Sequence, residues 1–303
     1  MRPRRLVVVL LVVAAGALFG TAGTAQALGP EGSPPLGVGI IRIVVGAAAL
    51  LIAMPLLGAS PRRLIPLWRT PAMIVTASTA GAYQLFFFAG VSRAGVALWT
   101  LVAVGSAPLF AGLVGWAVLR HRPTVGGLVA TVVCLVGLGL LTGPGISGDS
   151  AVGFLLALGA GLCIAGYNVA ARIQLDRGVG ALEVPTGSFA LGGLLLLPLL
   201  AAQPVGWIAT PSGAAMALYL GVATMGLANV LLTRGMRTLT PGPATTLMLT
   251  DPVVATVLGV LVLGETLVAV EVIGVLVILG GLFLQGALAS RSSSEEPEPI
   301  PVL

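Results

Sequence analysis

The side chain whose type and position most strongly indicate chemistry is Asp251, an acid within a long apolar run and directly before Pro252. A charge at the centre of a bilayer costs about 2.5–3.5 kcal/mol on insertion scales, so such a residue is expected to face a polar cavity or a partner. In one interpretation, Asp251 binds a cationic group of a substrate or carries a coupling proton. In the other, arginine or hydroxyl partners fix it and it stabilises a helix junction. Pro252 removes one backbone donor and predicts a hinge in the helix.

Arg42 is a basic residue placed inside an apolar run. It lies roughly two turns from the start of that run. Its guanidinium either holds an anionic group such as a carboxylate or extends along the helix to the outer membrane interface, as long charged side chains do. The residue types alone leave both roles open.

Further polar side chains recur at corresponding places in the two halves of the chain, as the lining of a shared cavity requires. These candidates for contact with a substrate are Tyr83, Gln84, Trp99, Thr100, Asn168 and Asn229. An amide in lipid needs a hydrogen-bond partner, and bonding between neighbouring helices explains any single one of them as well as a cavity does.

The residues that hydrolytic mechanisms require do not occur in suitable patterns. His121 is the only histidine, so a His-Glu-x-x-His metalloprotease motif cannot form. Asp251 is the only aspartate deep in a run, whereas an intramembrane aspartyl protease needs two, and a Gly-x-Ser-x-Gly elbow is missing from the sequence. Cys134 and Cys163 lie inside apolar runs without metal-ligand spacing. We therefore expect neither an enzyme nor a metal site.

Composition predicts the class of element that positions these residues. Hydrophobic residues make up 57% of the chain and charged residues 8%, with a mean hydropathy of +1.09. A soluble domain would carry about 25% charged residues. The apolar residues form runs of roughly 20, the length of helix that crosses a hydrocarbon core. The sequence therefore predicts an all-α integral membrane protein.

The apolar runs and the residues that interrupt them predict ten transmembrane helices. The first five lie near residues 6–25, 36–57, 72–91, 95–119 and 125–141. The second five lie near residues 152–173, 183–201, 213–233, 243–263 and 267–288. Strands are not expected, because the runs are too long and lack an alternation of polar and apolar residues.

The basic residues indicate the orientation of the chain. All fifteen are arginine, and most lie in short connections rather than in one patch, so the pI of about 10.2 does not indicate nucleic-acid binding. If the chain crosses the membrane at each predicted span, thirteen arginines fall on one side, Arg93 falls on the other and Arg42 lies within a span. Cytoplasmic connections carry the excess of arginine, which places both termini in the cytoplasm.

The chain also contains an internal repeat. Pro108 and Pro252 are 144 residues apart, and at the same offset Arg93 matches Arg237. Each copy is a long apolar segment with a proline near its middle, which predicts a hinge at Pro108 as well as at Pro252. Internal repeats of membrane helices are typical of secondary transporters.

Five spans in each half is an odd number, so the second half enters the membrane from the opposite side. The predicted organisation is two inverted five-helix repeats, residues 1–145 and 151–289, followed by a polar, acidic cytoplasmic tail at 290–303 that we expect to be disordered. Inverted repeats of this kind place a binding site near the midplane, where the halves meet.

The first span has a second interpretation. Its arginine-rich start, its apolar run and the sequence Ala25-Gln26-Ala27 resemble a signal peptide with a small-residue cleavage site. The run is longer than the ~7–15 apolar residues of a signal peptide, and the repeat needs a partner for the sixth span, so we expect the first span to be retained. Gly16 and Gly20 within it form a GxxxG spacing, which permits close helix contact but arises by chance in a chain with 43 glycines.

Three short stretches of the second repeat carry a family resemblance. Thr-Pro-Gly-Pro-Ala at 240–244, Leu-Thr-Asp-Pro-Val at 249–253 and Val-Leu-Gly-Glu-Thr-Leu at 262–267 resemble EamA-type transporters of the drug/metabolite transporter superfamily. In the first repeat, Arg42 and the segment 99–108 are similar to the same family.

One turn departs from a perfect duplication. Glu265 lies at the predicted outer turn between the last two spans, where a carboxylate caps the next helix or pairs with an arginine, so we interpret it as structural. The first repeat has Arg120 and His121 where the second has Gly264 and Glu265. The role of the turn carboxylate is therefore not duplicated.

The resemblance implies an inner-membrane carrier of ten helices, often an exporter of amino acids or other small metabolites, with no nucleotide or metal cofactor. Transport would be driven by a gradient, commonly of protons, or by exchange. We therefore expect a secondary active transporter that exports a small amino-acid-like or drug-like molecule by alternating access, in contact with membrane lipid. A channel or a lipid flippase-like carrier is the alternative, and an intramembrane enzyme or a scaffold fits the residues less well.

Overall fold

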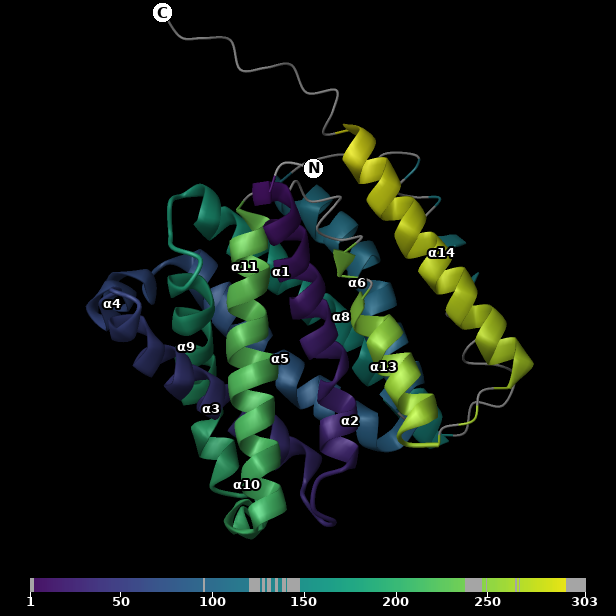
Figure 1. Cartoon of the computed structure of the whole chain (residues 1–303), viewed down its shortest axis with the longest axis horizontal. Helices are drawn as coiled ribbons and strands as arrows, with labels where there is room; N and C mark the ends of the chain where they lie inside the picture. The colour runs from purple at the N-terminus through teal and green to yellow at the C-terminus, as the bar shows by residue number, and fades with distance from the viewer. Residues whose placement is uncertain are drawn as a thin grey trace, which may run out of the picture.

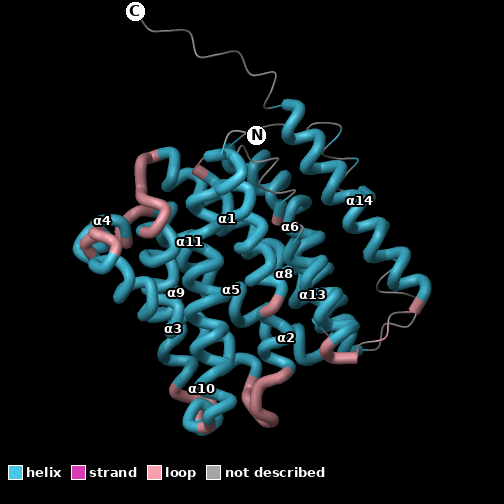
Figure 2. Tube along the Cα trace, in the orientation of Figure 1, coloured by secondary structure: helices cyan, strands magenta, loops and turns pink. Residues whose placement is uncertain are grey.

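The computed structural model describes residues 3–94, 96–119, 148–237, 247–248, 250–264, 266 and 268–292, with isolated positions between 126 and 140. Helices make up most of this described part of the chain, and it contains no strand (Figure 2). The all-helical class predicted from the sequence is therefore confirmed for these residues.

The helices of the first half lie at the predicted spans. They are α1 (Pro3–Gly20) with α2 (Ala22–Ala27), α3 (Pro35–Leu56), α5 (Pro71–Ala94) and α6 (Val96–Leu119). Between α3 and α5 the chain forms two short helical segments, η1 (Pro61–Arg63) and α4 (Leu64–Leu67). Most of the predicted fifth span, 125–141, lies outside the described residues.

The helices of the second half also lie at predicted spans. They are α8 (Gly148–Asp176), α9 (Glu183–Leu200), a continuous helix from Pro211 to Met236, α13 (Thr250–Leu261) and α14 (Ala269–Ser292). The continuous helix has three parts: α10 (Pro211–Leu218), the π-helical segment η3 (Tyr219–Leu227) and α11 (Ala228–Met236). A short 3-10 segment, η2 (Gly206–Ala209), precedes it.

Local sequence explains where several helices begin and end. Pro35 and Pro211 stand in the first turns of α3 and α10, where the missing N–H has no intrahelical partner to lose. Thr210 caps α10, since its hydroxyl accepts a hydrogen bond from the Gly213 N–H at 3.1 Å. After α3 and α8 the chain turns at Gly58 and Gly178, whose φ angles of 75° and 83° suit glycine.

The predicted ninth span differs from a single bent helix. Met248 lies in a turn and α13 begins at Thr250, so Asp251 and Pro252 stand in the first turn of α13. A proline is tolerated there because the first N–H groups of a helix have no intrahelical partner. The proline thus marks the start of a helix in the described chain, and its role as a hinge stays a prediction.

Among the described residues, five helices are long and apolar enough to cross a membrane. They are Val7–Ala27, Pro35–Leu56, Ala151–Asp176, Glu183–Leu200 and Pro211–Met236. Shorter apolar helices lie at Val102–Val114, Thr250–Leu261 and Val272–Gly281. The expected count of ten spans and their inverted arrangement stay predictions.

Helices from the two halves of the chain pack against each other. α3 contacts α9 and η3, and α5 contacts α8 and α9. Figure 1 shows α1 between α11 and α13, both of which it contacts. α14 lies at the edge of the bundle and contacts α6 (Figure 1).

Glycines permit two close crossings between helices of the two halves. A Cβ atom on Gly46 of α3 would lie 2.9 Å from the Cβ of Met225 and 3.0 Å from the carbonyl oxygen of Gly221, both in η3. A Cβ atom on Gly192 of α9 would lie 2.6 Å from the carbonyl oxygen of Ala77 in α5. The absence of side chains at these points lets the backbones approach closely, as is common in membrane helices.

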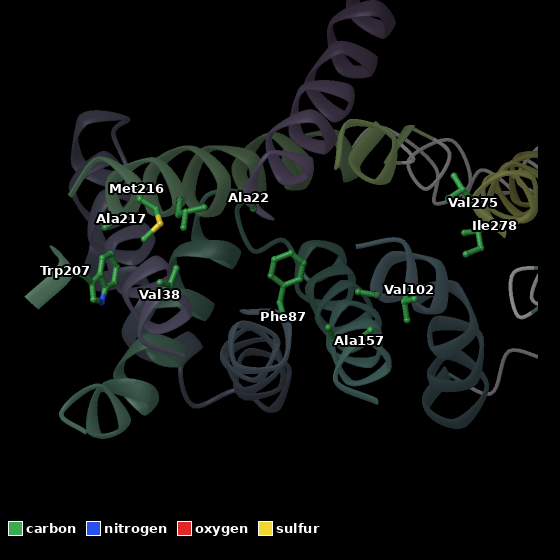
Figure 3. Packing of buried hydrophobic residues seen from close by; sticks show 13 residues of the cluster. Ala22, Val38, Phe87, Val102, Ala157, Trp207, Met216, Ala217, Val275 and Ile278 are labelled. Atoms are coloured by element: carbon green, nitrogen blue, oxygen red, sulfur yellow. The ribbon is translucent and has the colours of Figure 1, made fainter. Parts of the chain in front are cut away.

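Apolar side chains are divided between the interior and the outer surface of the bundle. One buried cluster includes Phe87, Val38 and Met216, and Figure 3 shows Phe87 near the middle of its labelled members. Other large apolar residues are exposed, among them Leu194 of α9 and Leu276 of α14, each at 62%. A protein that places so many large apolar side chains on its surface requires an apolar surrounding such as lipid.

Candidate functional site

Arg42 lies in the interior of the helix bundle, with 2% of its surface exposed. Its Nε donates a hydrogen bond to Thr224 Oγ1 at 3.1 Å, and its Nη1 donates to Gln84 Oε1 at 3.2 Å. The guanidinium also interacts with the hydroxyl group of Tyr83. One buried cation therefore links α3, α5 and η3, which come from both halves of the chain.

The close crossing of α3 and η3 positions this cation. Gly46 lies one turn after Arg42 and packs on Gly221, three residues before Thr224. Thr224 lies at the middle of the continuous helix from Pro211 to Met236. The Arg42 side chain therefore extends toward the middle of the bundle, and this conformation does not place it at the outer interface.

Two predicted residues of α5 complete the surroundings of Arg42. Gln84 is 1% exposed, and its Nε2 donates to the carbonyl oxygen of Ala80 at 3.3 Å, which orients Oε1 toward the guanidinium. The ring of Tyr83 stacks on that of Phe87, with centroids 5.2 Å apart. Tyr83 and Gln84 therefore both interact with Arg42, and their expected role in lining a substrate cavity stays a prediction.

Asp251 contributes a negative charge to the same region. It is half-buried in the first turn of α13, where the positive end of the helix dipole favours a carboxylate. Its backbone N–H donates to the carbonyl oxygen of Met248 at 3.1 Å. Electrostatic interactions connect it with Arg42 and with Tyr83. An arginine of the first half and an aspartate of the second half thus interact electrostatically.

The structure also describes the two predicted asparagines, whose expected contact with a substrate stays a prediction. Asn229 is buried, and its Nδ2 donates to the carbonyl oxygen of Met225, one turn earlier in the same helix, at 2.9 Å. Asn168 is half-buried in α8, one turn before Arg172. Gly166 of α8 packs on Thr79 of α5 and Gly159 packs on Phe86, so the two helices run antiparallel. Asn168 therefore lies beside the part of α5 that precedes Thr79, whereas Gln84 follows it.

Several predicted residues have no described side chain. Trp99, Thr100 and Pro108 lie in α6, whose backbone is described at these positions. Glu265 lies outside the described residues. Their proposed roles therefore stay predictions.

Sequence reasoning missed Thr224 as a partner of Arg42. Thr224 is fully buried, and its hydroxyl donates to the carbonyl oxygen of Leu220 at 2.7 Å while it accepts from Arg42. A threonine commonly bonds to its own helix in this way, so a single hydroxyl in an apolar run carries little signal. The π-helical turn that presents it has no sequence signature either.

A second buried polar cluster was also missed. Ser188 of α9 donates to Thr76 Oγ1 of α5 at 2.8 Å, and Gln174 Nε2 of α8 donates to the same oxygen at 3.2 Å. All three side chains are at most 2% exposed. This neutral cluster connects α5, α8 and α9 near the start of α5, apart from Arg42.

Both halves of the chain match a known protein family. The model of the EamA-like transporter family matches the chain twice, at residues 6–143 and 151–286. The chain belongs to the EamA-like transporter family. Together with its long apolar helices, this membership identifies a multi-pass membrane protein of a transporter family.

Curated relatives of this transporter-family chain cover nearly its whole length. An uncharacterized transporter of Bacillus subtilis (strain 168), YwfM, is 34% identical over 293 residues, which are 95% of this chain and 96% of the relative. The threonine/homoserine exporter RhtA of Escherichia coli (strain K12) is 30% identical over 279 residues, which are 89% and 88% of the two chains. A crystal structure with 22% identity covers 94% of this chain and 98% of its own, with a TM-score of 0.68, which supports the fold.

The arrangement of the EamA-family site defines what it can bind. Arg42 bonds to neutral oxygens of Gln84 and Thr224, which are weaker acceptors than a carboxylate. Asp251, which interacts electrostatically with Arg42, has carboxylate oxygens that can accept hydrogen bonds from a cation. A small molecule with one carboxylate and one ammonium group would find a partner for each charge.

Proposed function

We propose that the chain is a secondary active transporter that exports small metabolites of the amino-acid class from the cytoplasm. It works by alternating access in the cell membrane, with both termini in the cytoplasm and the binding site near the midplane. The single observation that carries the proposal is the buried Arg42, held between the two halves of the chain and opposite the charge of Asp251.

The packing of the helices supports the proposed inverted arrangement. The second helix of each half, α3 and α9, pack on each other. α5, the third helix of the first half, packs on α8 and α9, and the corresponding helix of the second half packs on α1 and α3 through α11 and η3. Two inverted repeats around a common axis produce such a reciprocal pattern.

The proposed substrate class follows from the two charges. The substrate carboxylate replaces Thr224 as an acceptor of the Arg42 donors while Gln84 keeps the guanidinium oriented, and its ammonium group binds the Asp251 carboxylate. The relative named as a threonine/homoserine exporter handles molecules with both groups. L-Threonine is therefore the first compound to test.

We further propose that Asp251 carries the coupling proton. Moving one elementary charge through 100 mV is worth about 2.3 kcal/mol, enough to drive a concentration gradient. An acid that binds the substrate ammonium when ionised and a proton when neutral exchanges one cation for the other. Outward movement of substrate is then linked to inward movement of a proton.

The test uses the full chain in liposomes with radiolabelled L-threonine. Saturable counterflow is expected for a carrier, whereas a channel gives no counterflow and an enzyme releases an altered product. The Asp251→Asn variant is expected to insert normally and to lose uptake driven by a proton gradient. Proton-driven uptake at the wild-type rate in that variant would contradict the coupling role, and absence of threonine counterflow in the wild type would contradict the substrate class.

A further inference from the structure

The helix α1 touches both second-half elements that contribute to the polar site. On one side, Val12 packs against α11 at Gly235, and the Thr21 hydroxyl shares a 2.8 Å hydrogen bond with the Tyr219 hydroxyl of η3. On the other side, Gly16 and Gly20 lie against α13. α1 therefore connects the segment that presents Thr224 to Arg42 with the segment that carries Asp251 (Figure 1).

The contact between α1 and α13 is closest at Asp251 itself. A Cβ atom on Gly20 would lie 2.5 Å from the carbonyl oxygen of Asp251 and 3.1 Å from the backbone nitrogen of Ala255. A Cβ atom on Gly16 would lie 3.3 Å from the backbone nitrogen of Asp251 and 3.1 Å from the Cβ of Thr250. Backbone atoms cannot rotate away as a side chain can, so a larger residue at either position must displace one helix from the other.

The separation between the Arg42 guanidinium and the Asp251 carboxylate determines whether the site can bind both charges of a zwitterion. The distance between a carboxylate and an ammonium group on one small molecule is fixed by its covalent structure. A site that binds both charges must therefore hold its own arginine and aspartate at a matching separation. α13 contacts α1, α2 and α6, while Arg42 is bonded through α5 and η3, and α1 contacts both α13 and η3. It is therefore one of the elements that connect the two charges.

We propose that α1, together with Thr21 directly after it, is a positioning element of the binding site, in which Gly16, Gly20 and Thr21 set the separation between the Asp251 carboxylate and the Arg42 guanidinium. This inference rests on the proposed function, because it assigns the spacing to a substrate with two charges. Gly16 and Gly20 do not contact the substrate and act through Asp251. The GxxxG spacing of the first span thus has a specific partner in the fold.

The first experiment compares alanine variants by uptake of L-threonine into liposomes. Gly20→Ala is expected to raise KM by about tenfold, because the added methyl group displaces Asp251 from its position relative to Arg42, and Gly16→Ala to raise it less. The matched control is Gly280→Ala in α14, where a Cβ would meet nothing within 4 Å; its KM is expected to stay within about twofold of the wild type. Equal KM values for Gly20→Ala and Gly280→Ala would overturn the proposal.

A double-mutant cycle separates positioning from general damage. If Gly20 acts through Asp251, Gly20→Ala has no further effect on residual threonine binding in the Asp251→Asn background. An additive loss would mean that the contact is merely structural. Tyr219→Phe adds no volume and removes the bond to Thr21, and it is expected to raise KM by about threefold, so the proposal remains testable if Gly20→Ala does not fold.

A second measurement does not depend on the substrate. In the full chain with Cys134→Ala and Cys163→Ala, the thiol introduced by Asp251→Cys is labelled with a maleimide in membranes. Adding Gly20→Ala is expected to raise the labelling rate by about fivefold or more, since α13 moves away from α1, and adding Gly280→Ala is not. An unchanged labelling rate in the Gly20→Ala variant would overturn the positioning role even if the wild type transports threonine. Absence of threonine transport by the wild type would contradict only the proposed function.

Discussion

Two crossings between the halves of the chain share a close, glycine-permitted approach but carry different polar groups. Where α3 meets η3, the buried side chain is a cation, Arg42, bonded to the hydroxyl of Thr224 at 3.1 Å. Where α9 meets α5, the buried groups are neutral, with Ser188 bonded to Thr76 at 2.8 Å. The two crossings therefore share a close approach of their backbones and differ in the charge of their buried side chains.

The difference in charge indicates a difference in role. Hydrogen bonds between neutral side chains stabilise membrane helix contacts by about 0.6 kcal/mol each and need nothing else nearby. A cation in the same surroundings costs several times more and is kept where a partner of opposite charge arrives. We infer that the α5–α9 region holds the bundle together, while the α3–η3 region binds the substrate.

The largest effect is expected from a variant that removes the buried cation of the α3–η3 crossing. Arg42→Leu is expected to lower the rate of threonine uptake by about 100-fold or more, because the loss of a buried charge partner costs 2–5 kcal/mol in binding. Arg62→Leu, which removes an exposed arginine beyond α3, is the control and is expected to transport normally. Uptake by Arg42→Leu at the Arg62→Leu rate would remove the distinction between the regions.

A matched pair of glutamines sharpens the comparison. Gln84→Leu is expected to raise the KM for threonine about tenfold, since Gln84 orients the guanidinium by a bond to a charged group. Gln174→Leu is expected to leave KM unchanged and to lower Tm by roughly 2–4 °C, because it removes a bond that joins α8 to α5. Uptake kinetics and thermal unfolding in detergent measure both; a reversed pattern would assign the binding site to the other crossing.

The smallest effect is expected from removing the ion pair between Arg63 and Glu183. Arg63 and Glu183 form an ion pair of 3.6 Å between η1 and α9, with most of the Arg63 side chain exposed. Arg63→Gln is expected to change the free energy of unfolding by about 0.5 kcal/mol or less, as for other exposed pairs, and to leave uptake unchanged. A large fall in Tm would mean that the charges near α9 contribute as much as its buried hydroxyl cluster.

Much of the fold was predictable because long apolar runs and arginine positions are strong signals in membrane proteins. The helix bounds of α3 and α5 lie within a few residues of the predicted spans. The segment 243–263 was harder, because the turn at Met248 has no proline or glycine beside it to mark it in the sequence.

The candidate site was predictable only in its rare residues. Arg42, Gln84 and Asp251 stand out because charges and amides are uncommon in apolar runs. Thr224 does not, because its value depends on the close crossing at Gly46 and on the π-helical turn of η3, which are tertiary features. Local patterns identify which side chains are costly in lipid, whereas packing determines which of them meet.

The π-helical turn of η3 has a consequence for motion. Each N–H of a π-helix bonds five residues back, so the segment contains a surplus residue relative to an α-helix. Passing that surplus along the chain would rotate the side chains it crosses by roughly 100°, while Thr210 still caps one end and Thr233 still bonds to Ala181 at the other, at 2.6 Å. Thr224 would swing away and free an Arg42 donor without any displacement of the helix ends.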